Sequence, residues 1–459
     1  MSNTGKAYVS GTDNQGQQYG NQAGVRQNLP QQILTLLPLT LFFPVGVMYG
    51  GVLLFYAALS VSGQWSQKWQ RIRHSPMLIP VLLLTVVSSL IGLTQEHSPE
   101  IAKEFWPGFS HYQTYLFLFP FLIVGAGVWQ RRAVYVFFAG ALMAASLFVA
   151  NFFHLLPANT LFRSYVIYEG NKSILLGILL AVAAGWMLHE WRLRRDYTIL
   201  RALAFLYVVI SLVLLAKTRT ASLMFVLLCA CLLLSRLRWS WRSLLIPFVF
   251  GLLLYGGWKY ATGLPAPATC EVRLVQAGPW EIFKLRSLCT IHQLRDFSEG
   301  RKVNEDGMRL EIYKITAEII AEKPWTGHGV ATWMMHYRQR AVGLSSATMT
   351  TPHNDYLLYM TELGAGGLLA LLGIFGMQLF IARHMSHVSQ VSQVSQAGQI
   401  DDASIRDHAM LLTMLTVAMM VGGMFNAILR DGVFGMAFMI LLAIPLSGIS
   451  WRSLARKSS

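Results

Sequence analysis

Long apolar segments recur along this chain, and they restrict its fold more than any other feature. Runs of about 18 or more apolar residues can cross a hydrocarbon core of roughly 30 Å. They occupy residues 77–94, 111–129, 132–152, 172–191, 198–216, 243–260, 355–382, 408–428 and 432–449. A shorter run covers 221–235, and the segment 33–60 is interrupted by Pro44 and Gly46. We interpret the interrupted segment as two linked spans, which gives twelve transmembrane helices, with eleven as the alternative.

The composition supports the same fold class. Of the 459 residues, 54% are hydrophobic and only 13% are charged. A soluble chain of ordinary composition carries about 25% charged residues. These values exclude a conventional globular enzyme and a disordered protein, and they predict an all-α polytopic membrane protein.

The distribution of basic residues gives the orientation. The chain has 37 Lys and Arg against 22 Asp and Glu, a net charge of +15 that by itself is compatible with nucleic-acid binding. The short loops on one side of the predicted bundle hold Lys68, Arg71, Arg73, Arg131, Arg132, Arg192, Arg194, Arg195, Arg201, Arg236, Arg238, Arg242, Arg452, Arg456 and Lys457. Cytoplasmic loops of membrane proteins carry this excess, so the charge marks the cytoplasmic side and predicts no nucleic-acid partner.

The opposite side receives the longest polar segment. The predicted organisation is a flexible tail, a first transmembrane bundle, a large periplasmic loop carrying helices, a second transmembrane set and a cytoplasmic tail, at 1–32, 33–260, 261–354, 355–449 and 450–459. The first segment lacks the order of a cleaved signal peptide. Cys270 and Cys289 both lie in the long loop, and we expect them to pair if it faces an oxidising compartment. Cys229 and Cys231 lie in an apolar run, where we expect packing roles.

An amphipathic helix is predicted within the large loop. Met308, Ile312, Ile315 and Ile319 recur at helical spacing with charged residues between them, which is typical of a helix lying on a surface. Pro324 and the turn 327–329 then end it. Arg309 belongs to its first turns, where a solvated surface charge is the ordinary interpretation and a functional role is the alternative.

The segment entering the next apolar run holds a candidate base. Thr351 is a plausible N-cap and Pro352 fits the first helical position, which places His353 in the opening turn of a membrane helix. The positive end of that helix disfavours the imidazolium, so a neutral His353 able to accept a proton is predicted. The structural alternative is a histidine hydrogen-bonded at a helix end. Further along, Glu362 is an intramembrane carboxylate that we interpret as a partner for a basic residue.

Two further basic groups face the same side. Lys217 and Arg219 form an exception to the orientation rule, and a guanidinium at such a position suits a bidentate phosphate, with snorkelling to lipid headgroups as the alternative. The pair Arg430 and Asp431 occupies a very short loop and is compatible with a simple ion pair. The sequence has no P-loop, dinucleotide fingerprint, zinc spacing or Asp-x-Asp motif. The exterior side also has no nucleotide pool, so a donor used there has to arrive already activated in the membrane.

Three blocks in this order resemble a known family. They are Lys-Thr-Arg-Thr-Ala-Ser at 217–222, Arg-Leu-Glu-Ile-Tyr-Lys with Ala-Glu-Lys-Pro-Trp-Thr-Gly-His-Gly at 309–329, and Pro-His-Asn-Asp-Tyr-Leu at 352–357 followed by Glu-Leu-Gly. Together they resemble the O-antigen ligase and O-antigen polymerase superfamily. The blocks cover about the central third of the chain, and the many-helix layout with one large exterior loop agrees over nearly all of it.

The resemblance implies a glycosyltransferase at the periplasmic face of the bacterial inner membrane. Its donor would be a glycan on undecaprenyl diphosphate, and no metal or other cofactor is implied. Arg219 and Arg309 match arginines implied to hold the diphosphate, and His353 matches a histidine implied to act on the acceptor hydroxyl. We assign possible supporting roles to Lys217, Asn354 and Arg430.

The superfamily contains three activities that the sequence separates poorly. The ligase transfers O-antigen to lipid A-core, the polymerase joins repeat units, and protein O-oligosaccharyltransferases modify serine or threonine. The size of 261–354 and the Thr-Pro-His-Asn block favour the ligase. A lipid or glycan transporter is a fourth alternative, but the candidate groups cluster at one interface instead of lying near the middle of the membrane.

Overall fold

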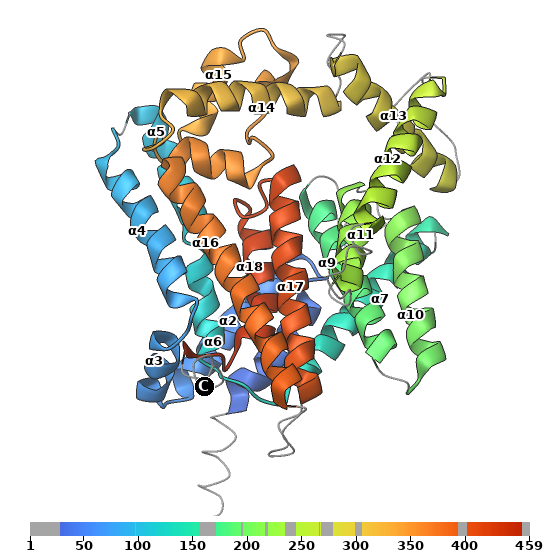
Figure 1. The fold of residues 1–459 in the computed structure, drawn as a ribbon. Helices are drawn as coiled ribbons and strands as arrows, with labels where there is room; N and C mark the ends of the chain where they lie inside the picture. The colour runs from blue at the N-terminus through green and yellow to red at the C-terminus, as the bar shows by residue number, and fades with distance from the viewer. Residues whose placement is uncertain are drawn as a thin grey trace, which may run out of the picture.

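The computed structural model describes residues 28–96, 98–153, 155, 171–193, 196–215, 219–234, 245–265, 267, 279–298, 305–392 and 402–451. Across these residues the fold is helical and contains no strand. A helix at residues 28–40, which begins within the predicted tail, precedes the labelled elements of Figure 1. These are α2 (Val45–Val61), α3 (Trp65–Arg73), α4 (Leu78–Thr94), α5 (Pro99–Tyr112), η1 (Thr114–Phe117), α6 (Leu118–Leu122), α7 (Trp129–Phe152), α9 (Asn171–Leu193), α10 (Thr198–Ile210), η2 (Ser211–Leu215), α11 (Arg219–Leu234), α12 (Leu245–Gly263), α13 (Pro279–Ser298), α14 (Glu305–Glu322), α15 (Trp333–Arg340), η5 (Ser345–Thr348), α16 (Asp355–Ser392), α17 (Asp402–Phe425) and α18 (Gly432–Leu446).

Several of these helices are apolar enough to cross a membrane. By length and composition, 4 qualify, in α7, α9, α16 and α17, and the number rises to 5 if the bent pair α2 and α3 counts as one span. Shorter apolar helices are Leu78–Thr94, Thr198–Val213, Thr220–Leu233 and Gly432–Leu446. The described residues thus confirm an all-helical chain with several apolar helices, whereas the predicted number of twelve spans is not confirmed.

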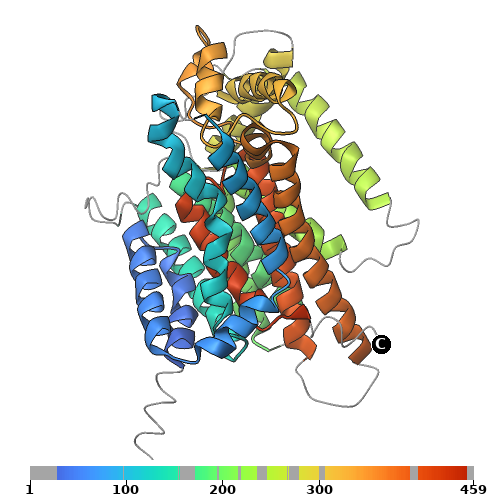
Figure 2. The same ribbon diagram turned by 90° about the vertical axis from the view of Figure 1, so that its left-hand side faces the viewer.

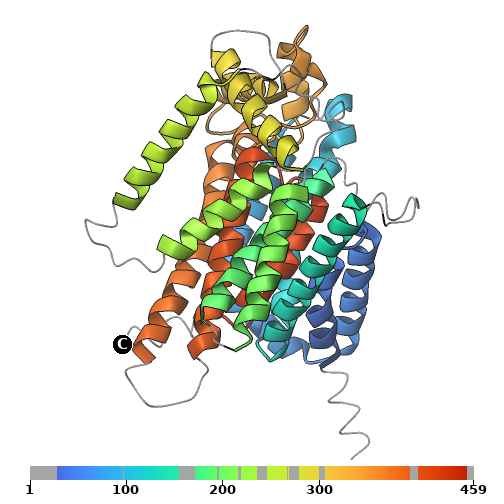
Figure 3. The same cartoon turned by 90° about the vertical axis from the view of Figure 1, so that its right-hand side faces the viewer.

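The helical bundle has two distinct ends (Figure 1). Helices α14 and α15 lie across one end, and α3 lies at the other, near the end of α18. Figures 2 and 3 show α12 leaning away from the bundle toward α13, with which it packs. We call the two extremities the α14 end and the α3 end.

The core of the bundle is built around α18. Every residue from Phe434 to Leu446 is buried, as expected for a helix that is apolar on all sides. Around it, α16 packs against α17 and α4, and α9 packs against α10 and α11. This packing fixes the start of α16 and the turn between α17 and α18 next to each other at the α14 end.

The predicted span 111–129 is not a single helix. Helix α5 starts at Pro99, where the Ser98 hydroxyl accepts a hydrogen bond from the Ile101 N–H, and the helical path then continues through η1 and α6 to Leu122. The helix therefore begins before residue 111, outside the predicted span. Hydropathy misses this start because an N-cap followed by proline begins a helix whatever the polarity of its first turns.

The cysteines follow the predicted division. Cys229 and Cys231 of α11 are free. Cys289 in α13 is buried and disulfide-bonded. Cys270 lies outside the described residues, so its pairing with Cys289 stays a prediction.

Candidate active site

Helix α14 is the platform of the site. Its apolar face, Ile312, Ile315 and Ile319, is buried against Trp333 and its neighbours, as the periodicity predicts. The Trp333 indole N–H also donates to the Thr316 hydroxyl at 3.0 Å. Because this face is fixed by packing, the residues on the adjoining face of α14 have a defined direction.

Arg309 and Tyr313 lie one turn apart on α14 and both reach the end of α17. The Arg309 Nη1 donates to the Phe425 carbonyl at 3.4 Å, a long hydrogen bond. The Tyr313 hydroxyl lies 3.2 Å from the Met424 carbonyl and 3.3 Å from the His353 carbonyl. Tyr313 therefore connects α14, α17 and the loop that carries His353.

The predicted helix start, with Thr351 as N-cap and Pro352 as the first helical residue, is wrong. Helix α16 begins at Asp355, and its cap is Asn354, whose side-chain oxygen accepts the Leu357 N–H at 3.0 Å. The Thr351 hydroxyl instead accepts the His353 N–H at 3.2 Å, which closes a local turn. His353 has φ of 49°, in the left-handed region, so it precedes the helix and does not belong to its first turn.

Asn354 also locks this loop to α17. Its amide nitrogen donates to the Met424 carbonyl at 3.0 Å, the same carbonyl that Tyr313 approaches. The Tyr313 and Asn354 side chains thus meet at the last turn of α17, next to the loop that carries His353. The backbone of His353 is held at two points, its N–H by Thr351 and its carbonyl by Tyr313, which is the arrangement expected where an uncommon φ is maintained.

The turn between α17 and α18 supplies a second arginine. Arg430 Nη1 donates to the Thr350 carbonyl at 2.6 Å. The turn itself is fixed from α16, since the buried Asp355 carboxylate accepts the Leu429 N–H at 3.1 Å. Asp431 accepts the Val433 N–H at 2.9 Å and so caps α18. The two residues therefore have separate structural partners, and the predicted simple ion pair between them does not describe this turn.

The charges of Arg309 and Arg430 both act on His353. Burial lowers the pKa of His353 to about 4, and the positive charges of Arg309 and Arg430 add to that shift. The ring is therefore neutral at pH 7, as predicted. The cause differs from the predicted one, because desolvation and two guanidinium charges act here instead of a position within the first helical turn.

Glu362 fastens a second loop to the same helix. Its carboxylate accepts hydrogen bonds from the Tyr112 hydroxyl at 2.7 Å, the Ala331 N–H at 2.8 Å and the Trp333 N–H at 3.3 Å. The interpretation of Glu362 as the partner of a basic residue is corrected accordingly: its hydrogen-bond donors are a tyrosine and two backbone groups. Three donors satisfy the hydrogen-bonding capacity of this buried carboxylate, which thereby connects α16 to α5 and to the loop before α15.

A kink in α16 makes room for that loop. Gly364 has φ of 62°, and a Cβ there would collide with the Trp325 carbonyl. On the loop side, Gly327 has φ of 68°, and a Cβ on it would meet the backbone of Glu362. The His328 N–H donates to the Thr361 carbonyl at 2.8 Å within the same contact. Both glycines are needed because two backbones touch at this point.

Arg430 also borders a small cavity of mixed polar and apolar lining next to Glu362. The cavity has a volume of about 30 Å³ and is lined by groups that include Glu362, Tyr112 and His111. Burial, followed by the charge of Arg430, lowers the pKa of His111 to about 4, although Asp431 opposes the shift. The charge of Arg430 thus acts on both His353 and His111.

The predicted site residues divide into two groups. Arg309, His353, Asn354 and Arg430 come together at the α14 end. Arg219 is the first residue of α11, but its side chain lies outside the described part of the chain, as does Lys217. Their participation in the site stays a prediction.

Sequence reasoning assigned no role to two further groups. Tyr313 stands four residues after Arg309 on a helix, and this spacing alone indicates that both share a face. For Asp355, nothing in the local sequence indicates that it holds the turn of Arg430. That contact joins residues 74 positions apart and follows only from the packing of α16 against α17.

The arrangement suits the transfer of a group away from an anionic leaving group. A neutral imidazole lies near two guanidinium groups, in a half-buried position where charge interactions are stronger than in water. Three or more His, Cys, Asp or Glu side chains do not gather into a metal-binding cluster anywhere in the described segments. The chain's own polar groups at this point are thus a candidate base and two candidate anion-binding cations.

Comparisons with known proteins agree with this picture. No curated protein matches the chain. A family model described as O-antigen ligase matches residues 203–372, a range from α10 to the middle of α16 that includes Arg219, Arg309 and His353 and ends before Arg430. Together with the apolar helices, this match indicates a membrane protein. The predicted resemblance to the O-antigen ligase superfamily is confirmed over residues 203–372, which match this family model.

Proposed function

We propose that this chain is an O-antigen ligase. In this proposal it transfers O-antigen polysaccharide from undecaprenyl diphosphate to a sugar hydroxyl of lipid A-core, at the periplasmic face of the bacterial inner membrane. The observation that carries the proposal is the electrostatic effect of Arg309 and Arg430 on His353. His353 and Arg309 lie within the residues that match the family model, and Arg430 lies outside them. The proposed reaction uses no metal.

Arginine side chains bind and stabilise the diphosphate in this proposal. Arg309, together with Arg219 from the start of α11, is proposed to hold the donor, and Arg430 adds positive potential next to them. A guanidinium matches two phosphate oxygens at once, which favours a bidentate contact. Negative charge grows on the diphosphate as its bond to the anomeric carbon breaks. A single preorganised donor at such a charge is typically worth about 3 to 4 kcal/mol.

His353 then removes the proton from the acceptor. The acceptor oxygen attacks the anomeric carbon from the face opposite the diphosphate, so one displacement inverts that carbon. The C–O bond to the acceptor forms while the bond to the diphosphate breaks, and the proton moves to the imidazole. With a pKa of about 4 the free ring is a weak base. A bound diphosphate offsets the arginine charges, and it thereby raises the basicity of His353 when the donor is present.

This coupling predicts a specific pH dependence. The acid limb of kcat/KM reports the free enzyme, and activity rises with pH as His353 loses its proton near pH 4. Changing Arg430→Gln removes one charge that lowers the pKa, so we expect the limb to move to higher pH. The measurement is the pH profile of transfer, with Arg338→Gln, an exposed charge on α15, as the matched control. If the acid limb of Arg430→Gln stays where it is in the wild type, His353 is not the group whose titration sets that limb.

The lipopolysaccharide pattern of a strain lacking this chain tests the function. Lipid A-core without O-antigen, together with accumulating polymerised carrier-linked glycan, is the expected result. Core bearing one repeat unit would identify a polymerase instead. Unchanged lipopolysaccharide with altered glycoproteins would identify a protein O-oligosaccharyltransferase. Restoration by the wild-type chain and not by a His353 variant would connect the phenotype to the proposed site.

A further inference from the structure

Helix α3 lies across the end of the bundle opposite the candidate active site (Figure 1). Of the three residues between α2 and α3, Gly63 and Gln64 have φ of 66° and 56°, and the chain bends there by 117°. Trp65 and Trp69 are 48% and 59% exposed on the resulting short helix. A transverse helix with exposed tryptophans at the end of an apolar bundle is typical of the membrane interface.

Helix α3 is also strongly basic. It carries Lys68, Arg71 and Arg73, and it contains no acidic residue. None of these cations forms an ion pair within the described ranges. Lys68 is turned inward, with its ammonium 2.6 Å from the Ser62 hydroxyl and 3.2 Å from the Leu59 carbonyl. The helix therefore concentrates positive charge that carboxylates of the described chain do not neutralise.

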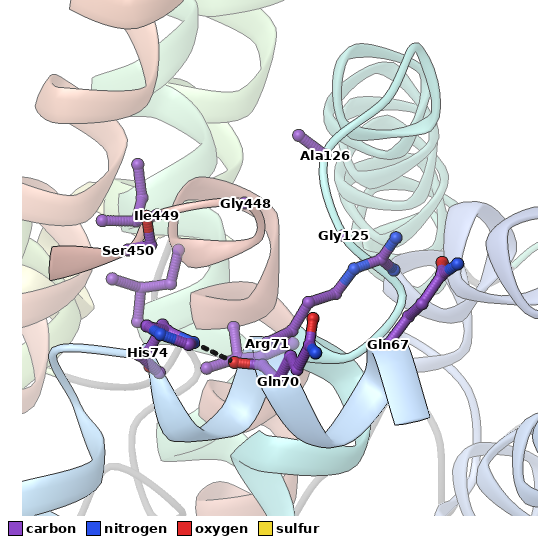
Figure 4. Close-up of a pocket in the computed structure, with 12 residues that line it drawn as sticks. Gln67, Gln70, Arg71, His74, Gly125, Ala126, Gly448, Ile449 and Ser450 are labelled. Atoms are coloured by element: carbon purple, nitrogen blue, oxygen red, sulfur yellow. Dashed lines mark hydrogen bonds between the residues drawn. The ribbon is translucent and has the colours of Figure 1, made fainter. Parts of the chain in front are cut away.

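A cavity opens between α3 and two other segments. It has a volume of about 560 Å³ and is bordered by α3, by the turn after α6 and by the segment after α18. Figure 4 shows Gln67, Gln70, Arg71 and His74 along one side, and Gly125 with Gly448 on the other segments. Backbone contacts join the segments, since the Trp451 N–H donates to the His74 carbonyl at 3.0 Å.

Arg71 is held at the border of this cavity. Its Nη1 donates to the Ile123 carbonyl at 2.6 Å and to the Val124 carbonyl at 2.9 Å. A Cβ at Gly125, whose φ is 78°, would lie 2.8 Å from the same nitrogen, so the turn contacts the guanidinium closely on this side, while Arg71 as a whole stays exposed. These carbonyls orient Arg71 but leave its full positive charge without a carboxylate partner. The cavity thus combines a fixed cation, amide side chains and an apolar wall that includes Leu122, Leu446 and Ile449.

We propose that this cavity binds the phosphate headgroup of an anionic phospholipid in the leaflet at the α3 end. Arg71 would meet the phosphate, Gln67 and Gln70 would donate hydrogen bonds to the headgroup, and the apolar wall would contact the glycerol and upper acyl chains. The tryptophans of α3 place the cavity at headgroup depth, which favours a lipid over a soluble anion. The site lies at the opposite end from Arg309 and does not depend on the proposed function.

Lipid binding to the purified full-length chain tests this inference. Native mass spectrometry with added dioleoylphosphatidylglycerol or dioleoylphosphatidylcholine measures the affinity for each lipid. We expect the wild type to prefer phosphatidylglycerol and Arg71→Gln to weaken that binding about fivefold, since one basic residue near an anionic surface has an effect of this size. Glutamine retains a donor for the two carbonyls, so the change removes mainly charge. Arg132→Gln, at the start of α7 and outside the cavity, is the matched control.

A second variant keeps the test decisive if Arg71→Gln does not fold. Gln70→Glu is nearly isosteric, lies on the exposed side of α3 and places a negative charge in the cavity. It is expected to abolish the preference for phosphatidylglycerol while leaving phosphatidylcholine binding unchanged. Equal binding of both lipids by the wild type, or an equal loss in Arg132→Gln, would refute the site. Displacement of the lipid by equimolar glycerol 1-phosphate would assign the cavity to a soluble phosphate and overturn the lipid proposal.

Discussion

Replacing His353 by asparagine is expected to lower the rate of glycan transfer by about 10² to 10⁴-fold, the usual contribution of a general base. Binding of the carrier-linked donor should stay near the wild-type value, because the proposed phosphate contacts come from arginines. The measurement is a reconstituted assay with purified undecaprenyl diphosphate-linked glycan and lipid A-core, with donor affinity determined separately.

Asparagine is the right replacement because of the backbone. His353 has φ of 49°, a conformation that asparagine adopts more readily than most residues. Alanine at this position adds backbone strain to the loss of the imidazole. A lower transfer rate in His353→Ala alone would therefore not distinguish the loss of the base from a destabilised loop. Near-normal turnover of His353→Asn would contradict the general-base role. A strict metal requirement, tested by adding a chelator to the wild type, would contradict the proposed mechanism even if the family domain stands.

The helical fold was predictable because apolar runs translate directly into helices. The runs 132–152 and 172–191 correspond closely to α7 and α9, and the break at Pro44 separates two helices as expected. The part of α5 before residue 111, which starts at Pro99, was not predictable from hydropathy. Its first turns are polar, and its helix depends on the local cap at Ser98 and on packing of α5 against α4.

The site was predictable only as far as local patterns reach. The amphipathic pattern of α14 and the residues Arg309 and His353 were identified from spacing and motif order. The cap of α16 was misplaced because Thr351 and Asn354 are both good capping residues, and the sequence does not say which one the loop uses. The contact of Tyr313 with Met424 joins positions 111 apart, and only the assembled bundle brings them together.

Arg309→Ala is expected to lower kcat/KM for transfer by about 10² to 10³-fold, the loss typical for one preorganised donor to a developing anion. Arg309→Lys should recover only part of this loss, since an ammonium is a point charge where a planar fork fits two phosphate oxygens. Donor binding should weaken in both variants, in contrast to His353→Asn. The measurements are the transfer rate and the affinity for carrier-linked donor in the same reconstituted system.

The structure separates this catalytic loss from a loss of folding. The bond from Arg309 to the Phe425 carbonyl is 3.4 Å long, so its removal should change the thermal midpoint little. Tyr313→Phe provides the opposite comparison. It keeps the charge of Arg309 and removes the hydroxyl near Met424 and His353, so it should loosen the His353 loop and reduce kcat more than donor affinity. Lys314→Ala removes an exposed charge from the next position of α14 and should leave both quantities unchanged. If Arg309→Ala binds donor as tightly as the wild type, the diphosphate is held elsewhere, and Arg309 acts only through its effect on the pKa of His353.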